Sequence, residues 1–556
     1  MKKISVLLAS TFLLISCGNR AEPIPSTSSP TSGDTTATPT SVDPTTDTSS
    51  TSPTSSSTSG EVQPTIVSIA LSGTYKTIFY QNEKFDYAGL IVTATYDNGN
   101  KEVITDYEVS ADTSKTGLVD VEVTSTKNKS VKTTYQINVI GKPSIYNEPY
   151  LSKQYYLNQV GDIYTAWNKY RGRGVTVAVI DSSFDAYHED FTFSNGVSKV
   201  LSTSASFSYD GSKVTTQVGI DKVHDDKGDP HGTFCAGVVS AGTNSKGVVG
   251  IAPDSSLLLL RVDKKPKSIC EAFKYAADNG AKVITISIGS YYDYEGDLID
   301  DGSDLSTVFN DSITYARNKG VVICSAGGNG GYTNPTEYTF PGACANVIGA
   351  GGLAFNGDGT IWSGSSYNSS PDYQFIDVFA QSDKMFGCTN MGYAGDWEGT
   401  SFASPIIAGV AALYFEKNPN ATPSQFETAL FNNCLPVKGT GLSMDNFGYG
   451  RVHASKTLSE ETTTSIDIRV KANSQVYLYA WNFAGTKEIA SWPGVAMNAQ
   501  LGTFTYSLDL NTYQNVIFSN TSGQTTNIEA FSFINNPTYD LTSPTLEGTY
   551  LVGSYK

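Results

Sequence analysis

Three short segments of the 556-residue chain carry side chains that together can perform nucleophilic chemistry. An apolar run at residues 175–180 ends in Asp181, a segment of small residues begins at His231, and Ser401 precedes a long apolar stretch. A serine hydroxyl is a poor nucleophile unless a positioned imidazole takes its proton. The imidazole in turn needs a buried carboxylate that fixes its tautomer. We therefore expect Asp181 to orient His231, His231 to act as the base and Ser401 to act as the nucleophile.

The elements that must position these side chains follow from the hydrophobic pattern. Apolar, β-branched runs at residues 175–180, 256–260, 282–286 and 320–324 alternate with helical patterns at residues 268–279 and 305–318. Strands that are apolar on both sides and separated by helices indicate a parallel sheet covered on both faces. Pro405 in the first turn after Ser401 favours a helix that opens at the serine. The backbone N–H of Ser401 is then available to an oxyanion.

In the order Asp, His, Ser, these segments resemble the subtilase family of subtilisin-like serine peptidases over residues 175–413. The resemblance implies an α/β fold with a parallel-sheet catalytic domain, and endopeptidase activity on a protein or peptide substrate. It also implies that Asn329 donates its amide to the tetrahedral intermediate, and that Ser287 and Gly289 bind substrate and wall the S1 pocket. The alternative is a glycan-binding surface adhesin whose protease domain is inactive. The intact Asp181, His231, Ser401 and Asn329 argue against it.

The resemblance also implies a structural calcium ion. Asp190 lies nine residues after Asp181, and Asn244 lies thirteen residues after His231, which are the distances of the family's most frequent calcium site. Calcium prefers oxygen ligands on flexible loops. The alternative is that both are solvated loop residues, because the family's N-terminal Gln ligand has no counterpart that the sequence reveals.

Two features depart from the family pattern. Ser183 stands two residues after Asp181, where the family usually has glycine, so the turn needs more space there. No inhibitory propeptide is recognisable directly before the catalytic domain. Either folding needs no such chaperone, or an unrecognised segment replaces it.

The N-terminus predicts an exported lipoprotein. Lys2 and Lys3 precede an apolar run at residues 4–15 that is too short for a permanent membrane helix. The run ends before Cys17 in a sequence that resembles a bacterial lipobox, so we expect a signal peptide at residues 1–16, lipidation of Cys17 and anchoring to the membrane at the bacterial cell surface. Residues 17–64 are rich in Ser, Thr and Pro and predict a disordered linker. The six remaining cysteines allow fifteen disulfide pairings, and the sequence does not choose among them.

Two β-rich modules flank the predicted protease domain at residues 142–460. Residues 65–141 alternate with period two and resemble bacterial Ig-like domains, which serve as spacers or bind ligands. Residues 461–556 predict another β-sandwich and resemble starch-binding carbohydrate modules. In that resemblance the sugar contacts are Tyr477, Tyr479, Trp492 and Gln524, and the ligand is an α-glucan or another glycan. The alternative is that half of these rings belong to the core.

The charge balance excludes one class of partner. The chain has 37 basic and 54 acidic residues and a formal net charge of -17. Such a chain is unsuited to electrostatic binding of nucleic acid or anionic lipid, so we expect no nucleic-acid partner. We further expect a monomer. The cleavage preference has no single-residue code in this sequence.

Overall fold

The computed structural model describes residues 63–291, 305–332, 334–336, 338–368, 374–443, 446–459, 465–481, 488–500, 503–509, 513, 515–529, 538–547 and 550–555. The predicted signal peptide, Cys17 and almost all of the predicted linker lie outside these residues. The chain divides into two units at residue 63, and all of the elements below belong to the second unit, Pro64–Lys556.

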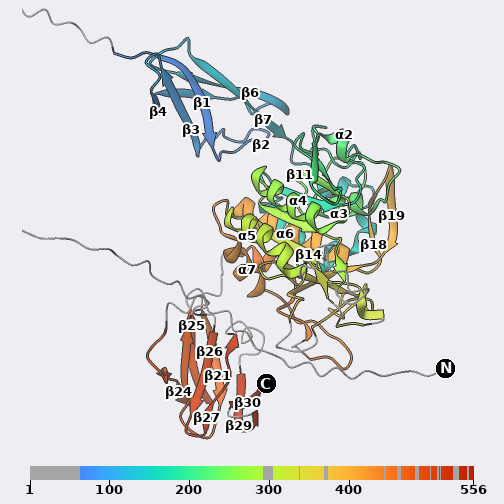
Figure 1. The fold of residues 1–556 in the computed structure, drawn as a ribbon, viewed down its shortest axis with the longest axis vertical. Coiled ribbons are helices and arrows are strands. Elements are labelled where there is room, and N and C mark those ends of the chain that lie inside the picture. Colours follow the sequence, from blue (N-terminus) through green and yellow to red (C-terminus); the bar gives the residue numbers. More distant parts are fainter. Residues whose placement is uncertain are drawn as a thin grey trace, which may run out of the picture. The chain divides into compact units, whose positions relative to one another are not determined.

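The first seven strands, drawn in blue in Figure 1, form two packed sheets. One sheet has the order β1-β3-β4 and the other β2-β7-β6-β5. Val92 and Ala94 of the first sheet share an apolar core with Val123 of the second. The strands are β1 (Ile66–Gly73), β2 (Ile78–Tyr80), β3 (Leu90–Tyr96), β4 (Lys101–Ile104), β5 (Tyr107–Ser110), β6 (Gly117–Ser125) and β7 (Lys132–Ile140).

A nine-stranded sheet of order β10-β9-β11-β8-β12-β14-β16-β17-β20 forms the centre of the following region. All neighbouring pairs are parallel except β10 with β9. Its strands are β8 (Thr176–Asp181), β9 (Ala205–Tyr209), β10 (Val214–Val218), β11 (Ser256–Val262), β12 (Val283–Ile286), β14 (Val322–Ala326), β16 (Ile348–Leu353), β17 (Val378–Gln381) and β20 (Gly450–Arg451). The α/β class predicted from the apolar runs is confirmed.

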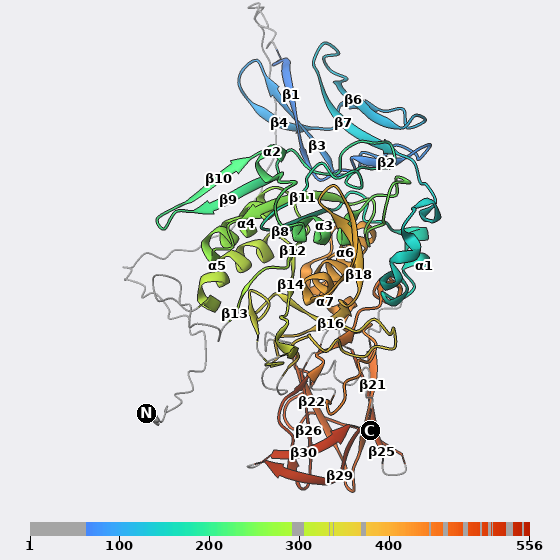
Figure 2. The same ribbon diagram turned by 90° about the vertical axis from the view of Figure 1, so that its right-hand side faces the viewer.

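Helices cover both faces of this sheet, and Figure 2 shows the two layers. Along β8, Val177 and Val179 pack with α3 (His231–Ser240) and α6 (Ala403–Lys417), whereas Ala178 and Ile180 pack with α4 (Pro266–Asp278) and α5 (Leu305–Asn318). Alternate side chains of a strand point to opposite faces. Because both sets are apolar, the strand is buried on both sides, as a parallel sheet requires.

Smaller elements complete this region. Two short antiparallel pairs join β13 (Ser290–Tyr291) to β15 (Thr339–Phe340) and β18 (Met385–Thr389) to β19 (Gly392–Trp397). The remaining helices are η1 (Ile145–Asn147), η2 (Leu151–Lys153), η3 (Tyr155–Gln159), α1 (Ile163–Lys169), α2 (Ile220–Val223), η4 (Gly330–Tyr332), η5 (Thr400–Phe402), α7 (Pro423–Phe431) and α8 (Ala454–Thr457).

The last strands form two further sheets, of order β24-β25-β21-β29-β30 and β23-β22-β26-β27, with β28 pairing to β26. Ile468, Leu478 and Phe518 belong to their common core. The strands are β21 (Ser465–Lys471), β22 (Tyr477–Trp481), β23 (Val495–Ala496), β24 (Asn498–Gln500), β25 (Thr503–Asp509), β26 (Asn515–Asn520), β27 (Gly523–Gln524), β28 (Ile528–Glu529), β29 (Thr538–Glu547) and β30 (Tyr550–Tyr555).

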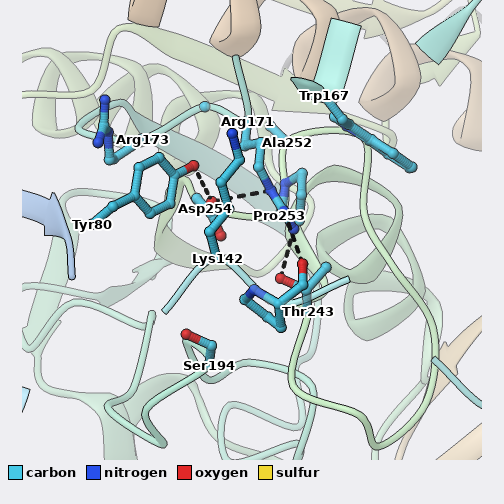
Figure 3. Close-up of polar contacts among 12 residues, drawn as sticks. Tyr80, Lys142, Trp167, Arg171, Arg173, Ser194, Thr243, Ala252, Pro253 and Asp254 are labelled. Atoms are coloured by element: carbon cyan, nitrogen blue, oxygen red, sulfur yellow. Dashed lines mark hydrogen bonds and ion pairs between the residues drawn. The ribbon is translucent and has the colours of Figure 1, made fainter. Parts of the chain in front are cut away.

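A buried polar network links β2 to the region of the nine-stranded sheet (Figure 3). The Tyr80 hydroxyl donates to Asp254 Oδ2 at 2.8 Å, and Arg171 Nε pairs with the same oxygen at 3.1 Å. The side chains of Arg171 and Asp254 are each 4% exposed. Arg171 also donates to Thr243 Oγ1 at 2.7 Å. A buried charge is tolerated when it is paired and hydrogen-bonded, as the charges of Arg171 and Asp254 are here. Because Tyr80 belongs to β2, these contacts join the first seven strands to the region that follows.

The six cysteines in the described residues are all free thiols, five of them buried: Cys235, Cys324, Cys344, Cys388 and Cys434, with Cys270 partly buried. The structure therefore uses none of the fifteen possible pairings. None of the described helices combines the length and the apolar composition needed to cross a membrane.

Candidate active site

Asp181 and His231 meet at the carboxyl end of β8. Asp181 is the last residue of β8 and is fully buried, and its Oδ2 lies 2.9 Å from His231 Nδ1. Its other oxygen accepts the backbone N–H of Ser182 at 2.7 Å. The carboxylate is thus held from two sides, and it keeps the Nδ1 proton of the imidazole directed toward itself.

His231 reaches Asp181 because α3 approaches β8 closely. A Cβ atom added at Gly232 would lie 2.2 Å from the carbonyl oxygen of Ser183 and 2.8 Å from Asp181 Cβ. Only glycine fits at this contact. His231 itself is the first residue of α3, and its N–H is accepted by Asp229 Oδ1 at 3.1 Å.

Opposing effects act on the imidazole. Burial lowers the pKa of His231, but the charge of Asp181 and the hydrogen bond to it raise the pKa by more, with a further contribution from Asp229. The positive charge of Lys264 acts in the opposite direction. The net result is a pKa above the ordinary value of histidine, so the folded site holds a proton on His231 more tightly than an isolated histidine does.

Ser401 lies in the 3-10 turn η5, immediately before α6, and not in the long helix that the sequence predicted to open at this residue. The helix starts two residues later because Gly399 to Phe402 form a tighter turn. Ser401 Oγ donates to the carbonyl oxygen of Ser287 at 3.2 Å, and Ser287 Oγ donates to the carbonyl oxygen of Ser401 at 2.7 Å. Cys235 Sγ lies 3.5 Å from that same Ser401 oxygen and near the Asp181 and His231 side chains, so the three predicted catalytic residues are brought together.

Ser287 and Gly289 follow the end of β12. Ser287 is only 7% exposed, and it exchanges two hydrogen bonds with Ser401, one in each direction. The sequence did not reveal this contact between Ser287 and the candidate nucleophile. Gly289 is exposed and precedes β13. Their predicted contact with substrate stays a prediction.

Asn329 lies beside the turn that carries Ser401. Its side-chain oxygen accepts both the backbone N–H and the hydroxyl of Thr400, each at 2.9 Å. Because Thr400 holds the oxygen, the orientation of the whole amide group, including its NH₂, is fixed. This orientation suits a donor to a developing oxyanion.

Ser183 fits without disturbing the site. Its side chain is 3% exposed and packs against Gly228, where an added Cβ would lie 2.2 Å from Ser183 Oγ. The space that the sequence required near this turn is therefore supplied by a glycine on the loop before α3.

Asp190 and Asn244 lie near a second acidic residue, Glu148. Asp190 Oδ2 accepts the Val248 N–H at 2.9 Å, and Asn244 donates to the carbonyl oxygen of Glu189 at 3.0 Å. Burial raises the pKa of Glu148, and the nearby charge of Asp190 raises it further. Asp190 Oδ1 and Glu148 Oε2 are buried without a hydrogen-bond partner.

Two buried carboxylate oxygens without donors fit a cation bound by oxygen ligands. Glu148 was missed because it stands 42 residues before Asp190 in the connector after the N-terminal strands, and no spacing rule relates the two.

The predicted sugar contacts lie on one surface of the C-terminal sheets. Tyr477 and Tyr479 are partly exposed on β22, whereas Leu478 and Ala480 between them are buried. The Trp492 side chain is 50% exposed, and its ring centroid lies 5.5 Å from that of Tyr479. These rings are therefore outside the core, contrary to the alternative.

A cavity of about 530 Å³ adjoins this surface. It is lined by Trp492, Pro493, Ser519, Asn520, Gly523, Gln524 and Tyr550. Tyr477 is the cross-strand partner of Ser519. Tyr550 is 41% exposed and was missed, because the sequence pattern gives no sign that β30 returns beside β27.

Known proteins resemble both the region of the nine-stranded sheet and the C-terminal strands. The model of the Subtilase family matches residues 172–450, and that of Starch-binding module 26 matches residues 470–530. Thermitase of Thermoactinomyces vulgaris is 30% identical over 322 residues, which are 56% of this chain and 98% of thermitase. The intracellular serine protease of Paenibacillus polymyxa is 29% identical over 53% of this chain and 83% of its own length.

Among solved structures, fervidolysin from Fervidobacterium pennivorans has 20% sequence identity and a TM-score of 0.46, covering 67% of this chain and 56% of that chain. A protease from Pseudoalteromonas arctica has 23% identity and a TM-score of 0.44, covering 57% of this chain and 99% of that chain.

Proposed function

Because the chain belongs to the subtilase family of serine endopeptidases, we propose that it cleaves internal peptide bonds through an acyl-enzyme intermediate on Ser401. The observation that carries this proposal is the 2.9 Å contact between His231 and the fully buried Asp181. Cys235, which lies near both side chains, also contacts Ser401. The adhesin with an inactive protease domain lacks support, because every member of the catalytic set is present.

Acylation needs one rotation of the nucleophile. Turning the Ser401 hydroxyl away from the Ser287 carbonyl oxygen directs its proton to His231 Nε2. Ser401 Oγ then attacks the substrate carbonyl carbon, and His231 takes the proton as its other nitrogen holds Asp181. The same proton passes to the leaving amine when the C–N bond breaks. Water repeats these steps to release the acid and regenerate Ser401.

The negative oxygen of each tetrahedral intermediate needs donors. The Asn329 amide and the Ser401 N–H are suited to this role, because Thr400 fixes the Asn329 side-chain oxygen on the opposite side. Donors that are already oriented stabilise the charge without reorganising during the reaction.

A fluorophosphonate probe tests the proposal on the full chain. The wild type should be labelled, Ser401→Ala should not, and Ser212→Ala, which changes an exposed serine on the β9–β10 hairpin, should label like the wild type. An unlabelled wild type, or equal labelling of Ser401→Ala, would overturn the proposal in favour of the adhesin.

We also propose a structural calcium ion held by Asp190, Asn244 and Glu148. The two buried carboxylate oxygens without donors support it. The ion would neutralise charge at this point and tie the connector to the loop after α3. A chelator should lower the midpoint of thermal unfolding of the wild type and leave that of Glu148→Gln unchanged. An unchanged wild-type midpoint, with no calcium in the purified protein, would count against the site.

For the C-terminal sheets we propose α-glucan binding on the surface of Tyr477, Tyr479, Trp492 and Gln524. The family match and the exposed rings support this, because aromatic faces stack on sugar rings. Electrophoresis of the full chain carrying Ser401→Ala through amylopectin gels is the measurement. Migration equal to that in a plain gel would remove the proposal.

Finally, we propose that the protein is a monomer anchored by lipid on Cys17 at the bacterial cell surface. The residue pattern before Cys17 supports the lipid anchor. Labelled palmitate should enter the wild type and not Cys17→Ala, and sedimentation of the detergent-solubilised protein should give the mass of one chain. Labelling of Cys17→Ala would refute the anchor.

A further inference from the structure

A surface cavity of about 500 Å³ reaches Ser182, the residue that follows Asp181. It is bordered by the end of β11, by β9 and by the residue after Asp181, namely Ser182. In the sheet register, Arg261 of β11 is opposite Asp181 on one side and Ser206 of β9 on the other. Neighbouring strands are about 4.8 Å apart, so the cavity starts one strand away from the catalytic carboxylate. Ligands of parallel sheets bind at the carboxyl ends of the strands.

The charged residues that line this cavity are mainly positive. Lys222, Arg261 and Lys264 line it, and Asp263 is the single acidic residue of the described lining. The Asp263 carboxylate already accepts the backbone N–H groups of Tyr209 at 2.7 Å and Lys265 at 3.2 Å. These hydrogen bonds to the backbone reduce how far the Asp263 carboxylate can neutralise the positive charges that line the cavity.

The three basic side chains differ in how they are held. Arg261 pairs with Asp225 at 3.0 Å and donates to the carbonyl oxygen of Ser182 at 3.1 Å, so it is fixed and partly neutralised. Lys222 and Lys264 are exposed, and neither has an ion-pair partner within the described part of the chain. Two ammonium groups therefore face this cavity in a protein whose formal net charge is -17.

This cavity also lies within reach of the reaction. The Ser182 N–H donates to the catalytic Asp181 at 2.7 Å, and the charge of Lys264 is near enough to His231 to lower its pKa. An extended peptide advances about 3.3 Å per residue. A substrate strand of a few residues that runs from Ser401 past His231 is therefore long enough to bring a side chain to a cavity that begins at Ser182.

We propose that this cavity binds an acidic side chain of the substrate close to the cleaved bond, with Lys222 and Lys264 as specificity-determining residues. The proposal rests on the endopeptidase function proposed above and names its substrate class, peptides with Asp or Glu near the cleavage site. A carboxylate between two ammonium groups forms charge-assisted hydrogen bonds, and an amide of the same shape lacks the charge.

Internally quenched peptides with blocked ends provide the test. In matched series, one position at a time from four residues before the cleaved bond to three after it carries Asp, Asn or Lys. At one position kcat/KM should fall in the order Asp, Asn, Lys, with about a tenfold difference between Asp and Asn at low salt. The preference should shrink at about 1 M salt, where charges are screened within about 3 Å.

Two neutral variants link the preference to this cavity. Lys264 has a left-handed backbone with φ of 65°, which asparagine tolerates, so Lys264→Asn removes the charge with little strain. Combined with Lys222→Gln, it should reduce the Asp over Asn preference to within about twofold. The matched control is Lys213→Gln, an exposed lysine on the β9–β10 hairpin outside the lining, which should keep the wild-type preference.

The possible outcomes distinguish failure of the acidic-substrate proposal from failure of the endopeptidase proposal on which it rests. Absence of any cleavage, together with no labelling by the fluorophosphonate probe, would overturn the endopeptidase function itself. Cleavage with no charge preference at any position, or a preference that survives in Lys222→Gln/Lys264→Asn, would overturn only the acidic-substrate proposal. A loss of preference in Lys213→Gln as large as in the double variant would assign the effect to overall charge and also overturn it.

Discussion

The catalytic centre and the C-terminal aromatic surface arrange their functional groups in opposite ways. Asp181 is fully buried and fixed by two hydrogen bonds, and the His231 side chain is 21% exposed. Trp492 and Tyr550 are 50% and 41% exposed and lie beside an open cavity. The first site depends on the orientation of a few polar atoms, and the second on the apolar area of several rings. Single substitutions should therefore be severe in the first site and graded in the second.

The largest effect is expected for Asp181→Asn. The amide keeps the shape but cannot hold the imidazole in the required tautomer, so kcat should fall by about 10⁴-fold. Steady-state kinetics on a quenched peptide measures this. The fold should persist, which circular dichroism would check. A loss of less than tenfold would show that the buried carboxylate is not what orients His231.

Asn329→Ala should come next, with kcat lowered by about 10²–10³-fold and KM little changed. The amide acts on charge that exists only in the transition state, so substrate binding is spared. A rise in KM at constant kcat would instead make Asn329 a ground-state contact. Thr400→Val tests the orientation, because it removes the hydroxyl that holds the Asn329 oxygen and should cause a smaller loss.

On the aromatic surface, Trp492→Ala should weaken binding to amylopectin by about tenfold without abolishing it. Tyr479 and Tyr550 keep stacking area in its absence. Affinity electrophoresis of the Ser401→Ala background gives the number. The control is Leu546→Ala, an exposed apolar residue of β29 outside the cavity, which should bind normally. Complete loss of binding from one ring would remove the contrast between the two sites.

The buried carboxylate of Asp254 differs from both sites. It helps to hold the N-terminal strands to the region of the nine-stranded sheet, and it takes no part in the proposed reaction. Tyr80→Phe removes the hydroxyl that donates to Asp254. The free energy of unfolding should fall by about 2 kcal/mol, because a buried charged acceptor loses a donor. Thermal unfolding measures it, and kcat should stay unchanged. Tyr96→Phe, which removes a hydroxyl that donates to the exposed Glu102, is the control and should lower the free energy of unfolding much less.

The smallest effect concerns pH. His231 must be neutral to accept a proton, and its raised pKa means that kcat/KM should increase with pH through a limb above about 6.5, the ordinary value of histidine. Asp229→Asn keeps an oxygen for the His231 N–H but removes a charge that raises this pKa. The limb should move to lower pH. A shift to higher pH would contradict the sign of this charge effect.

Much of the catalytic region could be predicted from residue types and order. The apolar runs predicted the strands β8, β11, β12 and β14. A strand that is buried on both faces is apolar at successive positions, so it is recognisable as a continuous apolar run. The three residues proposed as catalytic could be selected from the sequence because each stands at the end of a strong element. Ser401 was placed in the wrong element, since a tight turn and a helix start share the same small residues.

Contacts between distant residues were beyond the sequence. Glu148 beside Asp190, Tyr80 on Asp254 and Tyr550 beside Gln524 join residues that no local periodicity relates. The positions of charges in space could not be predicted either, because an acidic overall composition does not indicate that Lys222 and Lys264 line one cavity. Such features depend on how the elements pack.

The sequence alone determined the α/β class of the catalytic region and singled out Asp181, His231 and Ser401 as its candidate catalytic residues. It did so because strand burial, helix periodicity and the presence of a nucleophile can be recognised from residues that are neighbours in the sequence. Only the tertiary structure decided that Gly232 lets α3 approach β8, that Asn329 is turned by Thr400, and that two lysines face the cavity next to the catalytic carboxylate. Those are matters of distance between segments far apart in the chain, and distance is set by packing.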